Sequence, residues 1–148
     1  MFEHILIATD GSELADKAVE QSLMLAKALG AKVTVVMVTE SWDALSRAAL
    51  AKAQVRSAVA DYENHMAAAA NRILWSAGEK AKKLDVAYDT IHLKDRHPAE
   101  GIIETAQAEA CDLIVIASHG RRAIMTPIIG SQANRVATLS PVPVLVCP

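Results

Sequence analysis

Two glycine-containing segments carry most of the residue types that could bind a ligand. One is the turn DGS at 10–12, and the other is the stretch IASHGRRAIMTPIIGSQANRV at 116–136. Gly120 and Gly130 of the second stretch would let the backbone curl and approach a ligand closely. From Ser131 onward the sequence is typical of a helix, whose first N–H groups and positive dipole end favour an anion such as a phosphate.

A purely structural role is the alternative for both segments. Asp10 could be a turn residue before a helix, and Ser131 could be only an N-cap. If both follow neighbouring strands of one sheet, however, they flank the crevice in which open α/β sheets bind their ligands. Asp10 could then accept hydrogen bonds from ribose hydroxyls or an adenine amino group. We therefore expect a ligand site between the two segments.

Other polar residues give weaker signals. His92 and His97 flank a turn and could bind a metal, although single histidines at strand and helix ends are more often surface or capping groups. His119 could contact a phosphate or hold its own loop together. Arg121 and Arg122 could pair with a phosphate or remain solvated. The glycines form neither a Walker A loop nor a dinucleotide fingerprint, and spacing alone assembles no nucleophile–base pair.

The elements that must position these residues alternate along the chain. Apolar, often β-branched runs predict buried strands at His4–Thr9, Ala31–Val38, Val86–Leu93, Asp112–Ser118 and Val142–Cys147. Helices are expected between them, from Ala15 to a stop at Gly30, from Pro98 with buried Ala99, Ile102, Ile103, Ala106 and Ala110, and from Ser131 to about Leu139. This alternation predicts an α/β fold, a single domain over 1–148 with a parallel five-stranded sheet and helices on both faces.

The connection between the second and third strands is the least determined part. It is rich in alanine and exceeds one ordinary crossover helix in length. We expect a long helix from Val55 to Lys83, preceded by a helical or mobile excursion within 40–60. Aromatic residues in this connection could pack against the sheet or meet a partner subunit, and packing is the better expectation for each: Trp42, Tyr62 and Trp75.

Composition limits the class of protein. The chain has 148 residues, 52% of them apolar and 3% aromatic, and its net charge is −2. That balance argues against dedicated nucleic-acid or membrane-surface binding, which needs clustered Lys and Arg. No apolar run is long enough for a membrane span or a signal peptide. Cys111 and Cys147 lack metal-ligand spacing, so we expect buried free thiols in a cytoplasmic protein.

The chain resembles the universal stress proteins over essentially its whole length. The matching pieces are HILIATDGSELADKAVEQSLMLAKALGAKVTVVMV, HPAEGIIETAQAEACDLIVIASHGRR and GSQANRVATLSPVPVLV. The resemblance implies a Rossmann-like fold of the adenine nucleotide alpha hydrolase type, with the strand order 3-2-1-4-5.

The resemblance also implies a nucleotide site. ATP-binding members share a loop pattern, G-x2-G-x9-G-[S/T], that would fall on Ala117, Gly120, Gly130 and Ser131, with Ala117 in place of the first glycine. Asp10 matches an acidic residue that contacts adenosine, and Val38 matches a position whose backbone meets adenine. Arg121 and Gln132 complete the candidate cofactor-binding residues.

The function implied by the resemblance is that of a non-catalytic ATP-binding module that acts in the stress response as a homodimer, with Mg²⁺ accompanying ATP. The subunits would join through the last strand, Val142–Cys147, and bury Val144 and Val146 between them. Such a short apolar strand at a sheet edge suits pairing with its own copy. A nucleotide-free dimeric scaffold and a slow ATPase are the alternatives.

Overall fold

The computed structural model describes residues 1–40, 55–120 and 128–148, with side chains from residue 59 onward in the second range. In chain order the elements are β1 (His4–Ala8), α1 (Glu13–Leu29), β2 (Lys32–Thr39), α3 (Val55–Lys83), β3 (Tyr88–Lys94), α4 (Pro98–Ala108), β4 (Leu113–Ala117), α5 (Ser131–Leu139) and β5 (Val144–Cys147). Strands and helices alternate around the single long connection, as the apolar pattern predicted.

The strands form one parallel five-stranded sheet in the order β3-β2-β1-β4-β5, which confirms the predicted fold class. Ile7 of β1 pairs with Val35 of β2 on one side and with Val115 of β4 on the other. The chain thus runs outward from β1 in one direction and returns to continue on its other side. The strand order therefore reverses between β1 and β4, which is where open α/β sheets form ligand crevices.

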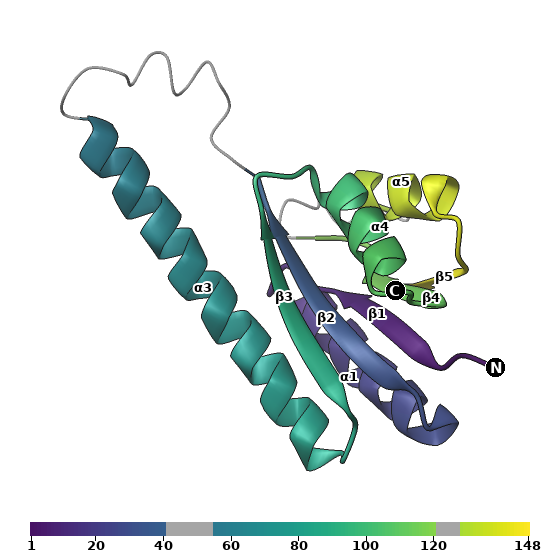
Figure 1. Ribbon diagram of the computed structural model, residues 1–148. Coiled ribbons are helices and arrows are strands. Elements are labelled where there is room, and N and C mark those ends of the chain that lie inside the picture. The colour runs from purple at the N-terminus through teal and green to yellow at the C-terminus, as the bar shows by residue number, and fades with distance from the viewer. Residues whose placement is uncertain (41–54, 121–127) are drawn as a thin grey trace.

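Helices cover both faces of the sheet (Figure 1). Ile5 and Ile7 of β1 pack into the core beneath α1 and α3, whereas Leu6 packs into the core beneath α4 and α5. All three side chains are fully buried, and burial of each contributes about 1.5–3 kcal/mol to folding. The period-two alternation within a continuous apolar run is what a strand buried on both faces requires.

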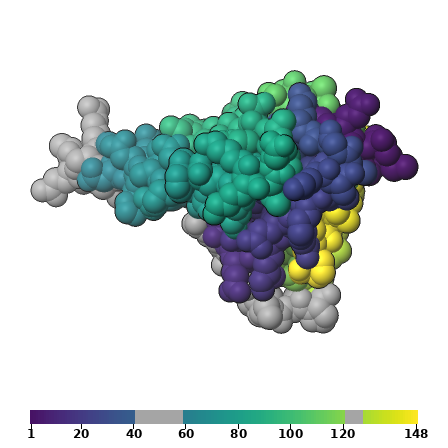
Figure 2. Space-filling view, turned by 90° about the horizontal axis from the view of Figure 1, so that it is seen from below, coloured from purple at the N-terminus to yellow at the C-terminus, as the bar shows by residue number. Residues whose placement is uncertain are grey.

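Helix α3 has the bounds that its sequence predicted, Val55–Lys83. Its buried positions recur at helical spacing: Ala70, Leu74, Ala77 and Ala81. The N-terminal part of the helix projects from the body of the molecule (Figure 2). The sheet therefore supports mainly the C-terminal half of α3.

Two ion pairs link the C-terminal half of α3 to α1. Lys80 Nζ lies 2.7 Å from Asp16 Oδ1 and 3.0 Å from Glu20 Oε1, and its side chain is 25% exposed. Burial alone would lower the pKa of Lys80, but the two carboxylates outweigh it and raise that pKa. These ion pairs fix α3 beside α1 on one face of the sheet.

Some predictions about this region were wrong. Trp75 was expected to pack, but it is 69% exposed. Ala110 was placed on the buried face of α4, yet it follows the end of that helix with φ +53° and is exposed. Tyr62 is half-buried, while Trp42 and the expected excursion around it lie outside the described residues.

The strand and helix ends differ little from those expected. Strand β3 begins at Tyr88 and β5 at Val144, each two residues later than predicted. Gly30 ends α1 in the left-handed conformation, with φ +68°. The free thiols of Cys111 and Cys147 are buried, as expected, and burial raises the pKa of Cys111 to about 11. No helix in the described ranges is long and apolar enough to span a membrane.

Candidate functional site

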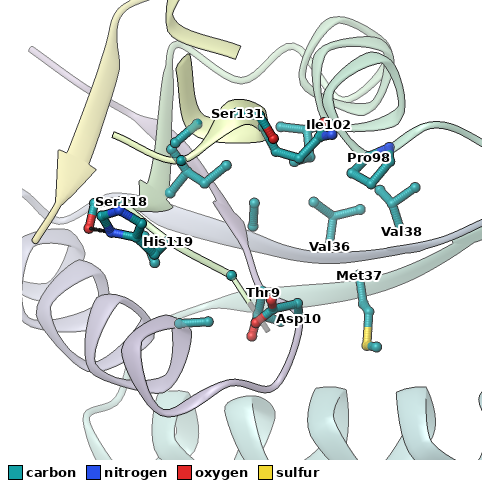
Figure 3. A pocket seen from close by; sticks show the side chains of 18 of the residues that line it. Thr9, Asp10, Val36, Met37, Val38, Pro98, Ile102, Ser118, His119 and Ser131 are labelled. Carbon is teal, nitrogen blue, oxygen red and sulfur yellow. Dashed lines mark hydrogen bonds between the residues drawn. The ribbon is translucent and has the colours of Figure 1, made fainter. Parts of the chain in front are cut away.

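A cleft of about 740 Å³ opens beyond the carboxyl ends of β1, β2 and β4 (Figure 3). It includes the reversal point of the strand order, and residues near the starts of α1, α4 and α5 line it. The predicted site residues that line it are Asp10, Val38, Ala117, Gly120, Gly130, Ser131 and Gln132. Arg121, the remaining candidate, lies outside the described residues, as does Arg122.

Asp10 combines the structural and the cleft-facing roles. Its Oδ1 accepts a hydrogen bond of 2.9 Å from the N–H of Ser12, so the carboxylate does shape the turn before α1. Ser12, in turn, is the N-cap, and its Oγ accepts from Ala15 N–H at 3.2 Å. The side chain of Asp10 also lines the cleft, where a Cβ added at Gly120 would lie 2.7 Å from its Oδ2.

The start of α5 differs from the expected arrangement by one residue. Gly130, with φ −58°, is the N-cap, so the interpretation of Ser131 as an N-cap is wrong. Gly130 also needs no left-handed conformation; its lack of a side chain matters because a Cβ there would lie 2.8 Å from the carbonyl oxygen of Ser118. The first helical bond runs from Asn134 N–H to Gly130 O. Residues 131–133 line the cleft with N–H groups that have no acceptor within the helix.

Ala117 fits its position without strain. It is the last residue of β4, pairs with Cys147, and is not among the described non-glycine residues with positive φ. The residue is 6% exposed and packs in the core beneath α1 and α3. The departure from the glycine pattern therefore costs no backbone strain here.

The hydrogen-bonding pattern of the sheet determines that the backbone N–H and C=O of Val38 point into the cleft. In a parallel strand both polar groups of one residue face the same neighbour, and successive residues alternate. Val33 N–H donates to Ala87 O at the β3 side, while Val36 O accepts from Thr9 N–H at the β1 side. Val38, two residues beyond Val36, therefore faces the β1 side past the point where β1 ends.

Gln132 has a structural partner that the sequence did not suggest. Its Oε1 accepts a hydrogen bond of 3.2 Å from Ala99 N–H, at the start of α4. Arg135 of α5 also pairs with Glu100 of α4. The pKa of the Glu100 carboxyl is lowered, first by a hydrogen bond from its own backbone N–H and then by Arg135. Gln132 thus ties the starts of the two helices together at the edge of the cleft.

Several residues that line the cleft were not predicted from the sequence. Helix α3 contributes Tyr62 and Met66, because its projecting part passes beside the opening. Thr39 and Glu40 follow the end of β2, and Thr39 Oγ1 lies 2.9 Å from His92 Nε2. Burial and then Lys94 lower the pKa of His92. Nothing in the helical periodicity of α3 indicates that it reaches the cleft.

The histidines near this edge of the sheet have protein partners. His97 Nδ1 lies 3.5 Å from Glu40 Oε1, and His92 is paired with Thr39. Within the described ranges, no three His, Cys, Asp or Glu side chains come together as a metal site. A second cleft, of about 290 Å³, lies between α3 and the edge strand β3, with the exposed Trp75 in its wall.

Comparisons with known proteins agree on one family. The model of the universal stress protein family matches residues 1–148. Universal stress protein YxiE of Bacillus subtilis is 29% identical over 147 residues, covering 99% of each chain. A universal stress protein of Thermus aquaticus, from the QAH/OAS sulfhydrylase 3′ region, is 32% identical over 152 residues and covers 98% of each chain.

Solved structures share the fold. MJ0577 of Methanocaldococcus jannaschii matches with a TM-score of 0.84 at 22% identity, over 99% of this chain and 96% of that one. A universal stress protein in complex with cAMP gives 0.69 at 20% identity, with coverage of 98% and 95%. One from Archaeoglobus fulgidus in complex with dAMP gives 0.68 at 18% identity, with coverage of 100% and 98%.

Proposed function

The chain belongs to the universal stress protein family, and from this premise we propose that it binds adenine nucleotides, in particular ATP with Mg²⁺, without catalysing their conversion. The observation that carries the proposal is the convergence of three groups on one cleft. These are the Asp10 carboxylate, the backbone of Val38, and the start of α5 at Gly130 and Ser131. They come from distant parts of the chain, and each suits a different part of a nucleotide.

The base would lie against the end of β2. The peptide N–H and C=O of Val38 offer one donor and one acceptor, which complement the ring nitrogen and exocyclic amino group of adenine. Guanine would present a carbonyl oxygen to the same peptide oxygen, so ATP is favoured over GTP. Met37 and Ile102, from opposite faces of the sheet, add apolar surface to the lining of the cleft, as ligand pockets commonly do.

The phosphates would lie at the start of α5, and Asp10 would accept hydrogen bonds from the ribose hydroxyls. The N–H groups of the first turn of a helix favour an anion. The described lining contains the acids Asp10 and Glu40 and no lysine or arginine. A divalent cation would offset part of the charge of a triphosphate, so we expect Mg²⁺ to strengthen ATP binding.

Binding without turnover follows from the partners of the polar groups. Hydrolysis needs a base that can orient and activate a water. Both ring nitrogens of His119 contact protein oxygens, and Asp10 accepts from the backbone of Ser12. Because these hydrogen bonds engage both groups in shaping the protein, we favour binding without turnover over a slow ATPase.

The related structures support the class of ligand. Two proteins with this fold were solved with cAMP and with dAMP, which share the adenine base and one phosphate. We extend adenine-nucleotide binding to this chain on the strength of its own cleft, and propose ATP because the start of α5, which favours an anion, lines the same cleft.

We further propose that the protein acts in the stress response as a homodimer joined through β5, which forms one edge of the sheet. Val144 and Val146, which we expected the partner to bury, are half-buried and pack within their own chain, whereas Leu145 is 43% exposed. Two such edges could pair through their backbones and cover both Leu145 side chains.

Equilibrium dialysis of the purified protein against ATP, with and without Mg²⁺, tests the proposal when released phosphate is assayed in parallel. We expect saturable binding that Mg²⁺ strengthens, no steady release of phosphate, and weak competition by GTP. Steady release would identify a slow ATPase instead. Absence of binding at millimolar ATP would leave the nucleotide-free scaffold.

A further inference from the structure

We infer that His119 is a positioning residue, which fixes the start of α5 before a ligand arrives. The inference rests on the proposed nucleotide site, because His119 would act by holding the start of α5 where a phosphate binds. The His119 ring lies beside Ser118 at the edge of the cleft (Figure 3). Its Nδ1 is 2.9 Å from Ser118 Oγ, and its Nε2 is 2.6 Å from the carbonyl oxygen of Ile128.

The two contacts define the role of each ring nitrogen. A carbonyl oxygen only accepts, so Nε2 carries a proton and donates to Ile128 O. In the neutral ring Nδ1 then accepts from the Ser118 hydroxyl. The imidazole therefore joins two points of the chain that are ten residues apart, 118 and 128, and its hydrogen-bonding groups face the protein. This arrangement favours the loop-holding role over direct contact with a phosphate.

A backbone bond lies next to this bridge. The Gly130 N–H donates to Ser118 O at 2.7 Å, directly before the first turn of α5. A Cβ at position 130 would lie 2.8 Å from that oxygen and 3.7 Å from Cδ2 of the His119 ring. The absence of a side chain at Gly130 thus lets the two chain segments approach, and His119 holds them at that separation.

The bridge formed by His119 should affect the affinity for ATP. A ligand that meets an already ordered helix start does not have to order it on binding. Removing the bridge from His119 to Ile128 should therefore weaken ATP binding about tenfold, the loss expected for one net hydrogen bond in a binding equilibrium.

Matched variants separate the two ring nitrogens. The side-chain amide nitrogen introduced by His119→Gln can reach the position of Nε2, whereas the shorter amide introduced by His119→Asn reaches only the position of Nδ1. We expect His119→Gln to keep ATP affinity within about threefold of wild type, and His119→Asn and His119→Ala to weaken it about tenfold. His119→Gln should unfold in urea at the wild-type midpoint, and His119→Asn and His119→Ala at only slightly lower midpoints, because each of the two loses the one hydrogen bond to Ile128.

Hydrogen exchange of the Gly130 amide, measured without nucleotide, tests the bridge itself. We expect slow exchange in wild type and His119→Gln, and faster exchange in His119→Asn and His119→Ala. Wild-type exchange in His119→Ala would overturn the inference, even if affinity fell, because the loss would then report direct contact with the ligand. If wild type bound no nucleotide, the proposed function would fail, while the exchange rates would still decide whether His119 orders this segment.

Discussion

Asp10 and Gly120 lie close together in the lining of the cleft. One carboxylate oxygen of Asp10 accepts from Ser12 N–H, and the other lies where a side chain at position 120 would begin. Any side chain there must displace the carboxylate from its cleft-facing position. Gly120 itself is exposed, so the same change should disturb little of the core.

We predict that Gly120→Ala lowers ATP affinity about tenfold by displacing the Asp10 carboxylate, with little change in the free energy of unfolding. Gly30→Ala is the matched control, since its Cβ would meet nothing within 4 Å but φ is +68°. That variant should lose about 1 kcal/mol of unfolding free energy and keep its affinity. Calorimetric titration and urea unfolding measure the two effects; wild-type affinity in Gly120→Ala would exclude Asp10 from the site.

The sequence predicts the positions of some site residues but not their hydrogen-bond partners. The positions of Asp10, Gly120 and Gly130 beside one cleft could be predicted, because they follow from the strand order and the loop pattern. The hydrogen bond from Ala99 N–H to Gln132 could not, since it depends on how two helices pack. Gln132, a predicted cofactor-binding residue, lines the cleft, and its carbonyl oxygen also holds the start of α4.

At the scale of elements, a buried histidine joins β1 to β2. His4 is 5% exposed, and its Nε2 lies 2.8 Å from Thr34 Oγ1. Burial and then Lys32 lower the pKa of His4, outweighing Glu109 and Asp112, which raise it. The neutral ring is therefore the form that the folded protein prefers.

We predict that the free energy of unfolding falls as the pH drops below about 6.5, where the unfolded chain binds a proton at His4 that the folded chain resists. The loss should end once the pH passes below the lowered pKa of the folded state. In His4→Gln the pH dependence should shrink, leaving the part contributed by His92, whose pKa is also lowered by burial.

Urea unfolding from about pH 8 to pH 5 measures this dependence, with His97→Gln as the control because the side chain of His97 is 83% exposed. An equal pH slope in wild type and His4→Gln would show that the buried ring does not couple folding to protonation.

The elements themselves were largely predictable. Helix α3 matches its predicted bounds because its helix formers and apolar spacing continue to Lys83. The exposure of Trp75 was not predictable from helical spacing, since it depends on how α3 packs against the edge strand β3. The same geometry brings Tyr62 to the cleft without any sequence signal.

At the scale of the whole molecule, the proposed dimer depends on β5. Leu145→Lys should convert a dimer to a monomer, because two like charges would meet in the paired edges. Met24→Lys is the control, since Met24 is 58% exposed and belongs to α1, not to the strand proposed to pair. Sedimentation equilibrium measures the mass of each variant, and a monomeric wild type would contradict the interface.

The central claim is that one cleft at the carboxyl ends of β1, β2 and β4 binds ATP. Calorimetric titration with ATP and Mg²⁺, on wild type and on Gly130→Val, tests it most directly, because a side chain at 130 would collide with Ser118 O beside the proposed phosphate position. We predict saturable binding by wild type and none by Gly130→Val, with the far-ultraviolet circular dichroism of the sheet and helices unchanged. Equal affinity in the two proteins, or no binding by wild type at millimolar ATP, would contradict the claim.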